Sequence, residues 1–324
     1  MVATWILAAP APAQQFVMKS GIATRADIQN EWQNRMKERM EARAGGRLKV
    51  EIYVAAQLGS NQVMIDGMQL GTVENFIAPG SFFVGVDPRF QILDVPGLFK
   101  DVDHLYATVR DPEFRRAYLD IGRAKELIGV GLMVYGPTSF ITRKPVRALG
   151  DFKGLKLRVF GSPLQTEPVR LLGAAPTPMG LTEVLPAFQN QVIDGMLSGI
   201  TVFTTFRYYD LTKYLTETSY SMITSMSLVS KPWYDKLPSD LRTMLIEEAD
   251  ALEPDLYKWG QAENNNAAKV WTEHGGELIH LPAADQAEMM RRIAVVADQV
   301  LGGNPATKDL YDLLKARAAA VARR

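Results

Sequence analysis

The chain has 324 residues, of which 47% are hydrophobic and 22% are charged, a composition typical of globular proteins. Its 36 Lys and Arg residues balance its 36 Asp and Glu residues, so it lacks the basic excess on which nucleic-acid binding depends. It contains no cysteine, which excludes disulfides, thiolate catalysis and cysteine-ligated metal sites.

The N-terminus has the features of an export signal. Residues 2–9 are mostly apolar, and an A-x-A pattern at 11–13 precedes Gln14. This pattern predicts the remainder of a secretory signal at residues 1–13, cut after Ala13, with a short disordered tail as the alternative. No later stretch approaches the roughly 18 apolar residues of a membrane span. We therefore expect a periplasmic protein that is not inserted in the membrane.

The first elements alternate between strand and helix. Residues 16–20 predict a strand, and residues 26–43 predict a helix with apolar side chains four apart at Ile28, Trp32, Met36 and Met40, which we assign to the core. Gly45-Gly46 should end this helix, and the alternating pattern of 48–54 predicts a second strand. Strand, helix and strand in this order favour a parallel sheet and an α/β fold.

The alternation continues along the chain. We predict strands at 74–78, 127–134, 155–159, 192–194, 219–229 and 277–281. We predict helices at 61–70, from a Thr182 cap to about 189, at 241–271 with a kink at Pro254, and twice more after the last strand.

Catalytic and metal-binding motifs are missing from the sequence. The three histidines are not spaced as zinc ligands, and the segment GMLSG at 195–199 has the wrong order for a nucleophile elbow. No phosphate-binding glycine motif follows a strand. We predict no catalytic residue, no metal and no cofactor, although an acid-base pair remains possible because carboxylates are plentiful.

Six segments resemble one family in a consistent order. They are AQLG at 56–59, DFKGLKLRV at 151–159, GAAPTPM at 173–179, EV at 183–184, FQNQVIDG at 188–195 and WYDKLP at 233–238. The series resembles the solute-binding proteins of TRAP transporters, a family that includes C4-dicarboxylate and sialic-acid binders. The match extends over nearly the whole chain after residue 13.

The resemblance implies a type II periplasmic-binding-protein fold, in which two α/β lobes are joined by crossing strands and a long helix braces both. Lobe I would comprise residues 14–136 and 225–262, and lobe II would comprise 137–224 and 263–324. A ligand would lie between the lobes, enclosed by hinge closure.

The resemblance also places Arg158 at the arginine that holds the ligand carboxylate in this family. Physical chemistry supports this role, because a guanidinium offers parallel N–H donors that match the two oxygens of a carboxylate. Without the resemblance, an arginine in this pattern would be interpreted as a surface ion-pair partner.

Other positions depart from the pattern of the sugar-acid binders. Thr138 stands in place of a second arginine, Ser198 in place of an asparagine and Leu181 in place of an aromatic residue, while Pro79 falls near an acidic position. These changes remove polar partners and favour a monocarboxylate with an apolar or aromatic body, or a 2-oxo acid. The complete set of expected ligand-binding residues is Arg158, Thr138, Ser198, Phe160, Leu181, Pro79 and Ala23.

Two alternatives interpret nearby residues as structural. Phe140 and Phe203 could line the pocket, but we favour core packing for both. Asp194-Gly195 is interpreted as a turn at a strand end.

The predicted function is therefore capture of a small organic acid and its delivery to the membrane subunits of a TRAP transporter. The alternatives are an enzyme that acts on a carboxylic acid and a sensor-type binding protein that reports to a receptor.

Overall fold

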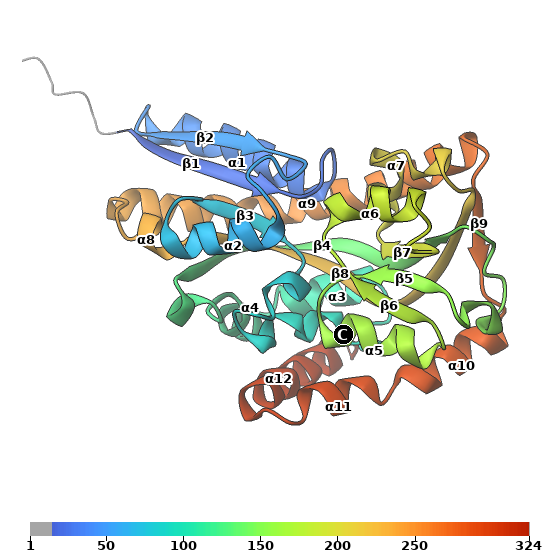
Figure 1. The fold of residues 1–324 in the computed structure, drawn as a ribbon. Helices are drawn as coiled ribbons and strands as arrows, with labels where there is room; N and C mark the ends of the chain where they lie inside the picture. Colours follow the sequence, from blue (N-terminus) through green and yellow to red (C-terminus); the bar gives the residue numbers. More distant parts are fainter. Residues whose placement is uncertain (1–14, 324) are drawn as a thin grey trace, which may run out of the picture.

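The computed structural model describes residues 15–323, so the predicted signal remnant at 1–13 lies outside the described residues. These residues build one mixed sheet with the strand order β2-β1-β3-β8-β4-β7-β5-β6, and β9 pairs with β8 (Figure 1). The strands are β1 (Phe16–Ile22), β2 (Leu48–Tyr53), β3 (Asn75–Ala78), β4 (Leu127–Thr142), β5 (Lys156–Val159), β6 (Ala175–Pro178), β7 (Gly195–Ser198), β8 (Tyr214–Ser230) and β9 (Glu277–His280).

Helices cover the sheet and follow most of its strands. They are α1 (Ile28–Ala44), α2 (Asn61–Leu70), α3 (Val102–Val109), α4 (Pro112–Leu119), α5 (Pro163–Leu171), α6 (Leu181–Gln189), α7 (Ile200–Thr205), α8 (Lys231–Tyr234), α9 (Ser239–Glu273), α10 (Ala283–Ile293), α11 (Val296–Leu301) and α12 (Pro305–Val321). The short 3-10 helices include η1 (Gly80–Phe83) and η2 (Pro88–Asp94). In α1, Met36 and Met40 are fully buried, as predicted, and Gly45 caps the helix in the left-handed conformation.

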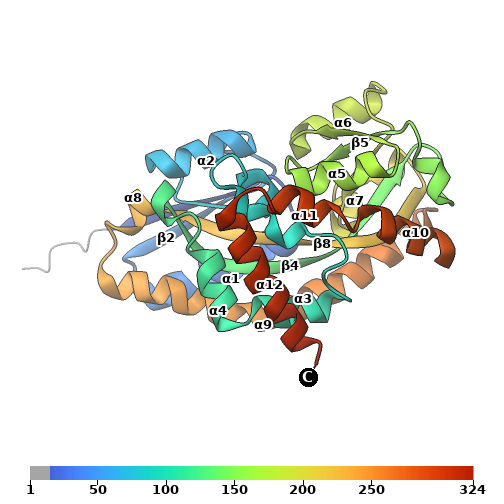
Figure 2. The ribbon, with the colours of Figure 1, turned by 90° about the horizontal axis from the view of Figure 1, so that it is seen from below.

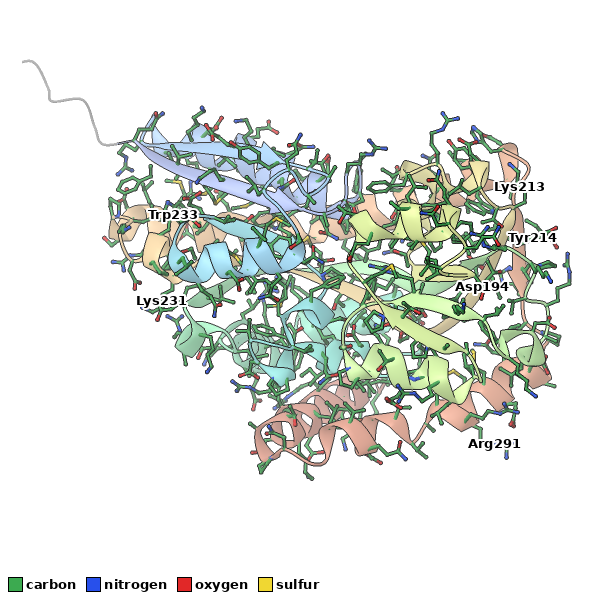
Figure 3. The ribbon with its side chains drawn as sticks, viewed as in Figure 1. Asp194, Lys213, Tyr214, Lys231, Trp233 and Arg291 are labelled. Atoms are coloured by element: carbon green, nitrogen blue, oxygen red, sulfur yellow. The ribbon has the colours of Figure 1, made fainter. Side chains whose placement is uncertain are left out.

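Two long antiparallel strands join two halves of the sheet. One end of β8 pairs with β3 and the other end with β9, while the far end of β4 pairs with β7. Tyr214 begins β8 and Lys231 directly follows it, and Figure 3 shows these two residues on opposite sides of the molecule. The register of β4 and β8 shifts between Gly129 and Gly131, Val134 and Gly136, and Pro137 and Ser139. These bulges bend the strands where they cross between the halves.

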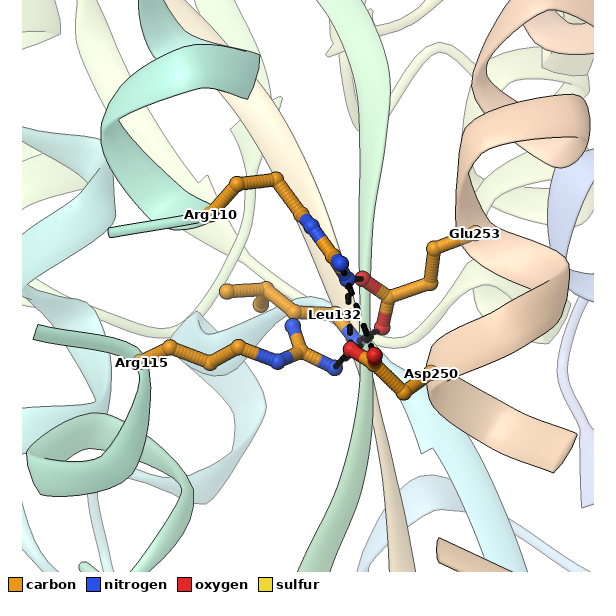
Figure 4. Close-up of polar contacts among 5 residues, drawn as sticks. All are labelled: Arg110, Arg115, Leu132, Asp250 and Glu253. Carbon is orange, nitrogen blue, oxygen red and sulfur yellow. Dashed lines mark hydrogen bonds and ion pairs between the residues drawn. The ribbon is translucent and has the colours of Figure 1, made fainter. Parts of the chain in front are cut away.

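Helix α9 connects the two halves. Its 35 residues pack against α1 and β4 in one half and against α7 and β9 in the other. An ion-pair network around the buried Glu253 fixes it to β4, to the end of α3 and to α4 (Figure 4). The carboxylate of Glu253 accepts hydrogen bonds from Arg110 (3.0 Å), Arg115 (2.7 Å) and the backbone N–H of Leu132 (2.8 Å). A charge buried in this way is stable only because each of its oxygens has a partner.

The C-terminal helices contact both halves. Helices α10 and α11 pack against α5, whereas α12 packs against α3, α4 and η2 (Figure 2). The predicted boundaries assigned all of 263–324 to lobe II, but α12 lies against elements that those boundaries place in lobe I. The boundaries of the lobes therefore stay a prediction.

Three sequence predictions about local elements were wrong. Residues 192–194 form a bend before β7, in which the carboxylate of Asp194 accepts a hydrogen bond from the backbone of Lys156. Gly180, not Thr182, precedes α6, and its N–H donates to Glu183. Three helices, rather than two, follow β9. Helix α9 runs through Pro254 without ending there, and the kink stays a prediction.

Candidate functional site

A small cavity of about 40 Å³ lies between the two halves of the sheet. Residues that directly follow parallel strands line it: Ala23 after β1, Pro79 after β3 and Phe160 after β5, while Ser198 ends β7. The carboxyl ends of parallel strands are where ligands bind in open α/β sheets. The remaining lining residues are Thr24, Gln29, Asn61, Ile77, Ala78, Phe82, Tyr135, Arg158, Leu181, Val202 and Ile223.

A groove leads from this cavity to the surface. It passes between the start of α2 and the start of α6, and it shares Ala23, Asn61, Phe82 and Leu181 with the cavity. The two helices come from opposite halves of the sheet (Figure 1). A change in the angle between the halves would therefore open or close the route to the cavity.

Six of the seven predicted site residues line the cavity: Ala23, Pro79, Arg158, Phe160, Leu181 and Ser198. Thr138 does not. It is fully buried in β4, where its hydroxyl donates to the carbonyl of Ser221 (3.0 Å) and accepts from the N–H of the same residue (3.4 Å). These bonds hold the bulge between β4 and β8, so Thr138 has a structural partner. Contact of the other six with a ligand stays a prediction.

Arg158 is held in place by backbone carbonyls. Its side chain is 1% exposed, its Nε donates to the carbonyl of Met179 (3.1 Å) and its Nη1 donates to the carbonyl of Leu197 (3.1 Å). Strand β5 places it between β6 and β7, its two neighbours in the sheet. Its orientation is therefore fixed before any ligand enters.

The charge of Arg158 has no paired acid in the part of the chain that the structure describes. Within residues 15–323, no carboxylate forms an ion pair with this guanidinium, and Glu183 acts on it only at longer range. Burial lowers the pKa of Arg158 to about 10, which still leaves it protonated at neutral pH. A buried cation without a counter-ion is costly. An anion in the cavity would offset that cost.

Two aromatic rings meet beside the guanidinium. Phe82 from η1 and Phe160 from the end of β5 have ring centroids 5.4 Å apart. The guanidinium carbon of Arg158 lies 4.9 Å from the centre of the Phe160 ring, a cation–π contact. These rings come from opposite halves of the sheet and form an apolar wall next to the charge. Phe140 and Phe203, in contrast, are fully buried in the core and do not line the cavity, as we favoured.

Tyr135 connects the two halves next to the cavity. Its hydroxyl donates to Asp27 at the N-cap of α1 (2.8 Å) and accepts from Thr201 of α7 (2.9 Å). Burial raises the pKa of Asp27, although its hydrogen bonds act in the opposite direction. No sequence pattern pointed to this role, because Tyr135 directly follows the apolar run 127–134. Thr24 could have been predicted as a cavity-lining residue, because it closely follows β1.

No group of three or more metal-ligating side chains occurs within residues 15–323. Over the same residues, no helix is both long enough and apolar enough to span a membrane.

The fold and the cavity are those of a two-lobed binding protein, and comparison with known proteins assigns the family. Residues 20–302 match the family of bacterial extracellular solute-binding proteins, family 7, and the chain belongs to this family. It is 28% identical over 300 residues to the C4-dicarboxylate-binding periplasmic protein DctP of Rhodobacter capsulatus, covering 91% of this chain and 89% of that protein. It is 26% identical over 230 residues to the 2,3-diketo-L-gulonate-binding periplasmic protein YiaO of Escherichia coli, covering 70% and 69%.

Solved structures share this fold. A TRAP periplasmic solute-binding protein from Desulfovibrio salexigens, with bound orotic acid, has a TM-score of 0.89 at 22% identity and covers 95% of this chain and 100% of that one. A second one, from Shewanella oneidensis with bound succinate, has a TM-score of 0.87 at 22% identity and covers 94% and 99%. The predicted family and fold class are confirmed, and the chain is a solute-binding protein rather than an enzyme.

Proposed function

We propose that this protein captures a small monocarboxylate in the periplasm and delivers it to the membrane subunits of a TRAP transporter. The observation that carries the proposal is the buried guanidinium of Arg158, which lines the cavity and has no carboxylate partner among the described residues. A ligand carboxylate would satisfy it with two parallel charge-assisted hydrogen bonds.

The charge of the lining supports one carboxylate over two. Arg158 is the one charged side chain among the fifteen residues that line the cavity. A dicarboxylate would bury a second negative charge without a cation to pair with it, at a cost of several kcal/mol. Not every relative is named as a binder of monocarboxylates, since DctP of Rhodobacter capsulatus is named as a C4-dicarboxylate binder.

The remaining lining favours an apolar body with a single polar substituent. Nine lining residues are apolar: Ala23, Ile77, Ala78, Pro79, Phe82, Phe160, Leu181, Val202 and Ile223. Ser198, Gln29 and Asn61 supply hydrogen-bonding groups that suit an oxo or hydroxyl group. We therefore propose a 2-oxo acid or an aliphatic or aromatic monocarboxylate as the ligand. The cavity of about 40 Å³ is smaller than typical small-molecule sites of about 300–1,000 Å³, so the two halves must move apart to admit such an acid.

A thermal-shift screen against organic acids tests this proposal. The library should pair aliphatic, aromatic and 2-oxo monocarboxylates with dicarboxylates and sugar acids of similar size. A ligand at 100 times its dissociation constant adds about 2.7 kcal/mol to the folded state, a rise of several degrees in melting temperature. A rise with monocarboxylates supports the proposal. A rise with dicarboxylates or sugar acids alone would contradict the ligand class, and no rise with any acid would contradict acid binding.

Binding alone does not distinguish a transport protein from a sensor. A proteoliposome assay with the membrane subunits of a TRAP transporter would do so, because accumulation of the acid in the vesicles should require this protein.

A further inference from the structure

The buried carboxyl group of Asp94 lies between the two halves of the sheet, outside the cavity lining. Asp94 ends η2 and is 3% exposed. One of its oxygens accepts hydrogen bonds from the hydroxyl of Ser81 and from the hydroxyl of Ser162 (3.3 Å). Ser81 belongs to η1, after β3, whereas Ser162 precedes α5, after β5. Asp94 thus accepts one hydrogen bond from each half of the sheet.

A second hydrogen bond also joins η2 to α5 in the other half of the sheet. The side-chain oxygen of Gln91 accepts from the backbone N–H of Leu164 (3.2 Å) in the first turn of α5. The first N–H groups of a helix have no partner within the helix, so η2 caps α5 from the other half of the sheet. Ser81 is adjacent to the cavity-lining Phe82, and one residue separates Ser162 from the cavity-lining Phe160. This contact therefore lies directly beside the cavity.

The contact leaves three buried polar atoms without partners within residues 15–323: the amide nitrogen and oxygen of Gln165 and the hydroxyl of Tyr220. They include donors and acceptors, so they suit either protonation state of Asp94. Burial favours the neutral state, because Asp94 is 3% exposed and no cation pairs with it among the described residues.

We propose that Asp94 is a positioning residue for ligand capture, which latches the two halves together through Ser162 and favours the closed cavity when it is protonated. The proposal rests on the proposed function, because closure serves to hold a ligand. Asp94 would affect affinity without touching the ligand.

The electrostatics give the sign of the pH dependence. Burial raises the pKa of Asp94 to about 6, although its hydrogen bonds act in the opposite direction. The titratable groups whose pKa responds to Asp94 are Tyr118 and Tyr220, and both stay neutral because burial raises their pKa. Within residues 15–323, no Lys, Arg or His forms an ion pair with Asp94. Opening would hydrate the carboxyl group and return its pKa toward the ordinary value of 3.8.

Closing of the two halves is therefore coupled to the uptake of a proton by Asp94 at pH values between 3.8 and about 6. Closure is favoured as pH falls below about 6 and loses that contribution as pH rises above it. With the two pKa values, the ratio of closed to open molecules should be about tenfold higher at pH 5 than at pH 8.

Single-molecule energy transfer on the ligand-free protein tests the latch. The chain has no cysteine, so Asp66→Cys on α2 and Gln189→Cys on α6 give two specific labelling sites on exposed residues of opposite halves. The labelled protein should show the tenfold change in the closed-to-open ratio between pH 8 and pH 5. Asp94→Asn should keep a high ratio at both pH values, because the amide carries no charge. Ser162→Ala should lower the ratio at both.

Asp87→Asn is the matched control, since Asp87 caps the same 3-10 helix but pairs with Arg89 away from α5. It should keep the pH response of the parent. An unchanged closed-to-open ratio between pH 8 and pH 5, no detectable closed population at pH 5, or the same pH response in Asp94→Asn as in the parent would overturn the proposal. No ligand is added, so this outcome is independent of the acid screen.

Discussion

Removal of the Arg158 side chain should abolish tight binding. A hydrogen bond to a charged group contributes about 1.5–3 kcal/mol, so the loss of two bonds to a carboxylate costs about 3–6 kcal/mol. In Arg158→Ala, affinity for the acid with the largest thermal shift should fall on the order of 10²- to 10⁴-fold. Isothermal titration calorimetry measures this directly. Arg158→Lys keeps the charge without the planar fork and should lose less affinity than Arg158→Ala.

Arg143→Ala is the matched control for this variant. Arg143 lies in the same half of the sheet and its guanidinium stacks on Phe188 at 4.2 Å, but it does not line the cavity. Its replacement should leave affinity unchanged. A loss below threefold in a folded Arg158→Ala protein would refute the assignment of Arg158 as the carboxylate anchor. Circular dichroism and the melting temperature of the ligand-free protein establish that the variant is folded.

Three further substitutions test the contacts of α9, the hydrogen bonds of Tyr135 and the size of the cavity. Glu253→Ala should destabilise the protein by about 3–5 kcal/mol in urea unfolding, because it leaves the buried N–H of Leu132 unpaired and leaves Arg110 and Arg115 with the half-exposed Asp250 alone. Glu247→Ala, on the exposed face of α9, should have little effect. Tyr135→Phe should lower stability by about 1–3 kcal/mol, measured in the same way, because Asp27 and Thr201 each lose a buried partner. Ala78→Leu should fill part of the cavity and weaken the longest acids most in calorimetry, while the shortest acid keeps most of its affinity.

The sequence predicted the fold well where local patterns and tertiary structure agree. The spacing of Trp32, Met36 and Met40 identified the buried face of α1, and Gly45 identified its end. Prediction failed where a side chain from a distant segment determines the structure. Residues 192–194 look like a strand, but they form a bend in which the carboxylate of Asp194 accepts a hydrogen bond from the backbone N–H of Lys156. No local pattern carries that information.

The prediction of the site also succeeded where a local motif was present and failed where a tertiary contact decides. Arg158 could be placed because a motif surrounds it, and six predicted residues line one cavity. Thr138 occupies a matching sequence position, but a register shift between β4 and β8 directs its hydroxyl to Ser221. Tyr135 and Asp94 could not be found, because their roles depend on partners from the other half of the sheet. Their partners Thr201 and Ser162 are more than 60 residues away in the chain.

We propose that the cavity recognises one carboxylate through Arg158. The most direct test is calorimetric titration with the acid that gives the largest thermal shift and with its primary amide, which keeps the shape but removes the charge. The amide would leave the buried guanidinium unpaired, so we predict that it binds at least about a hundredfold more weakly than the acid. Equal affinity for the acid and the amide would contradict carboxylate recognition by Arg158.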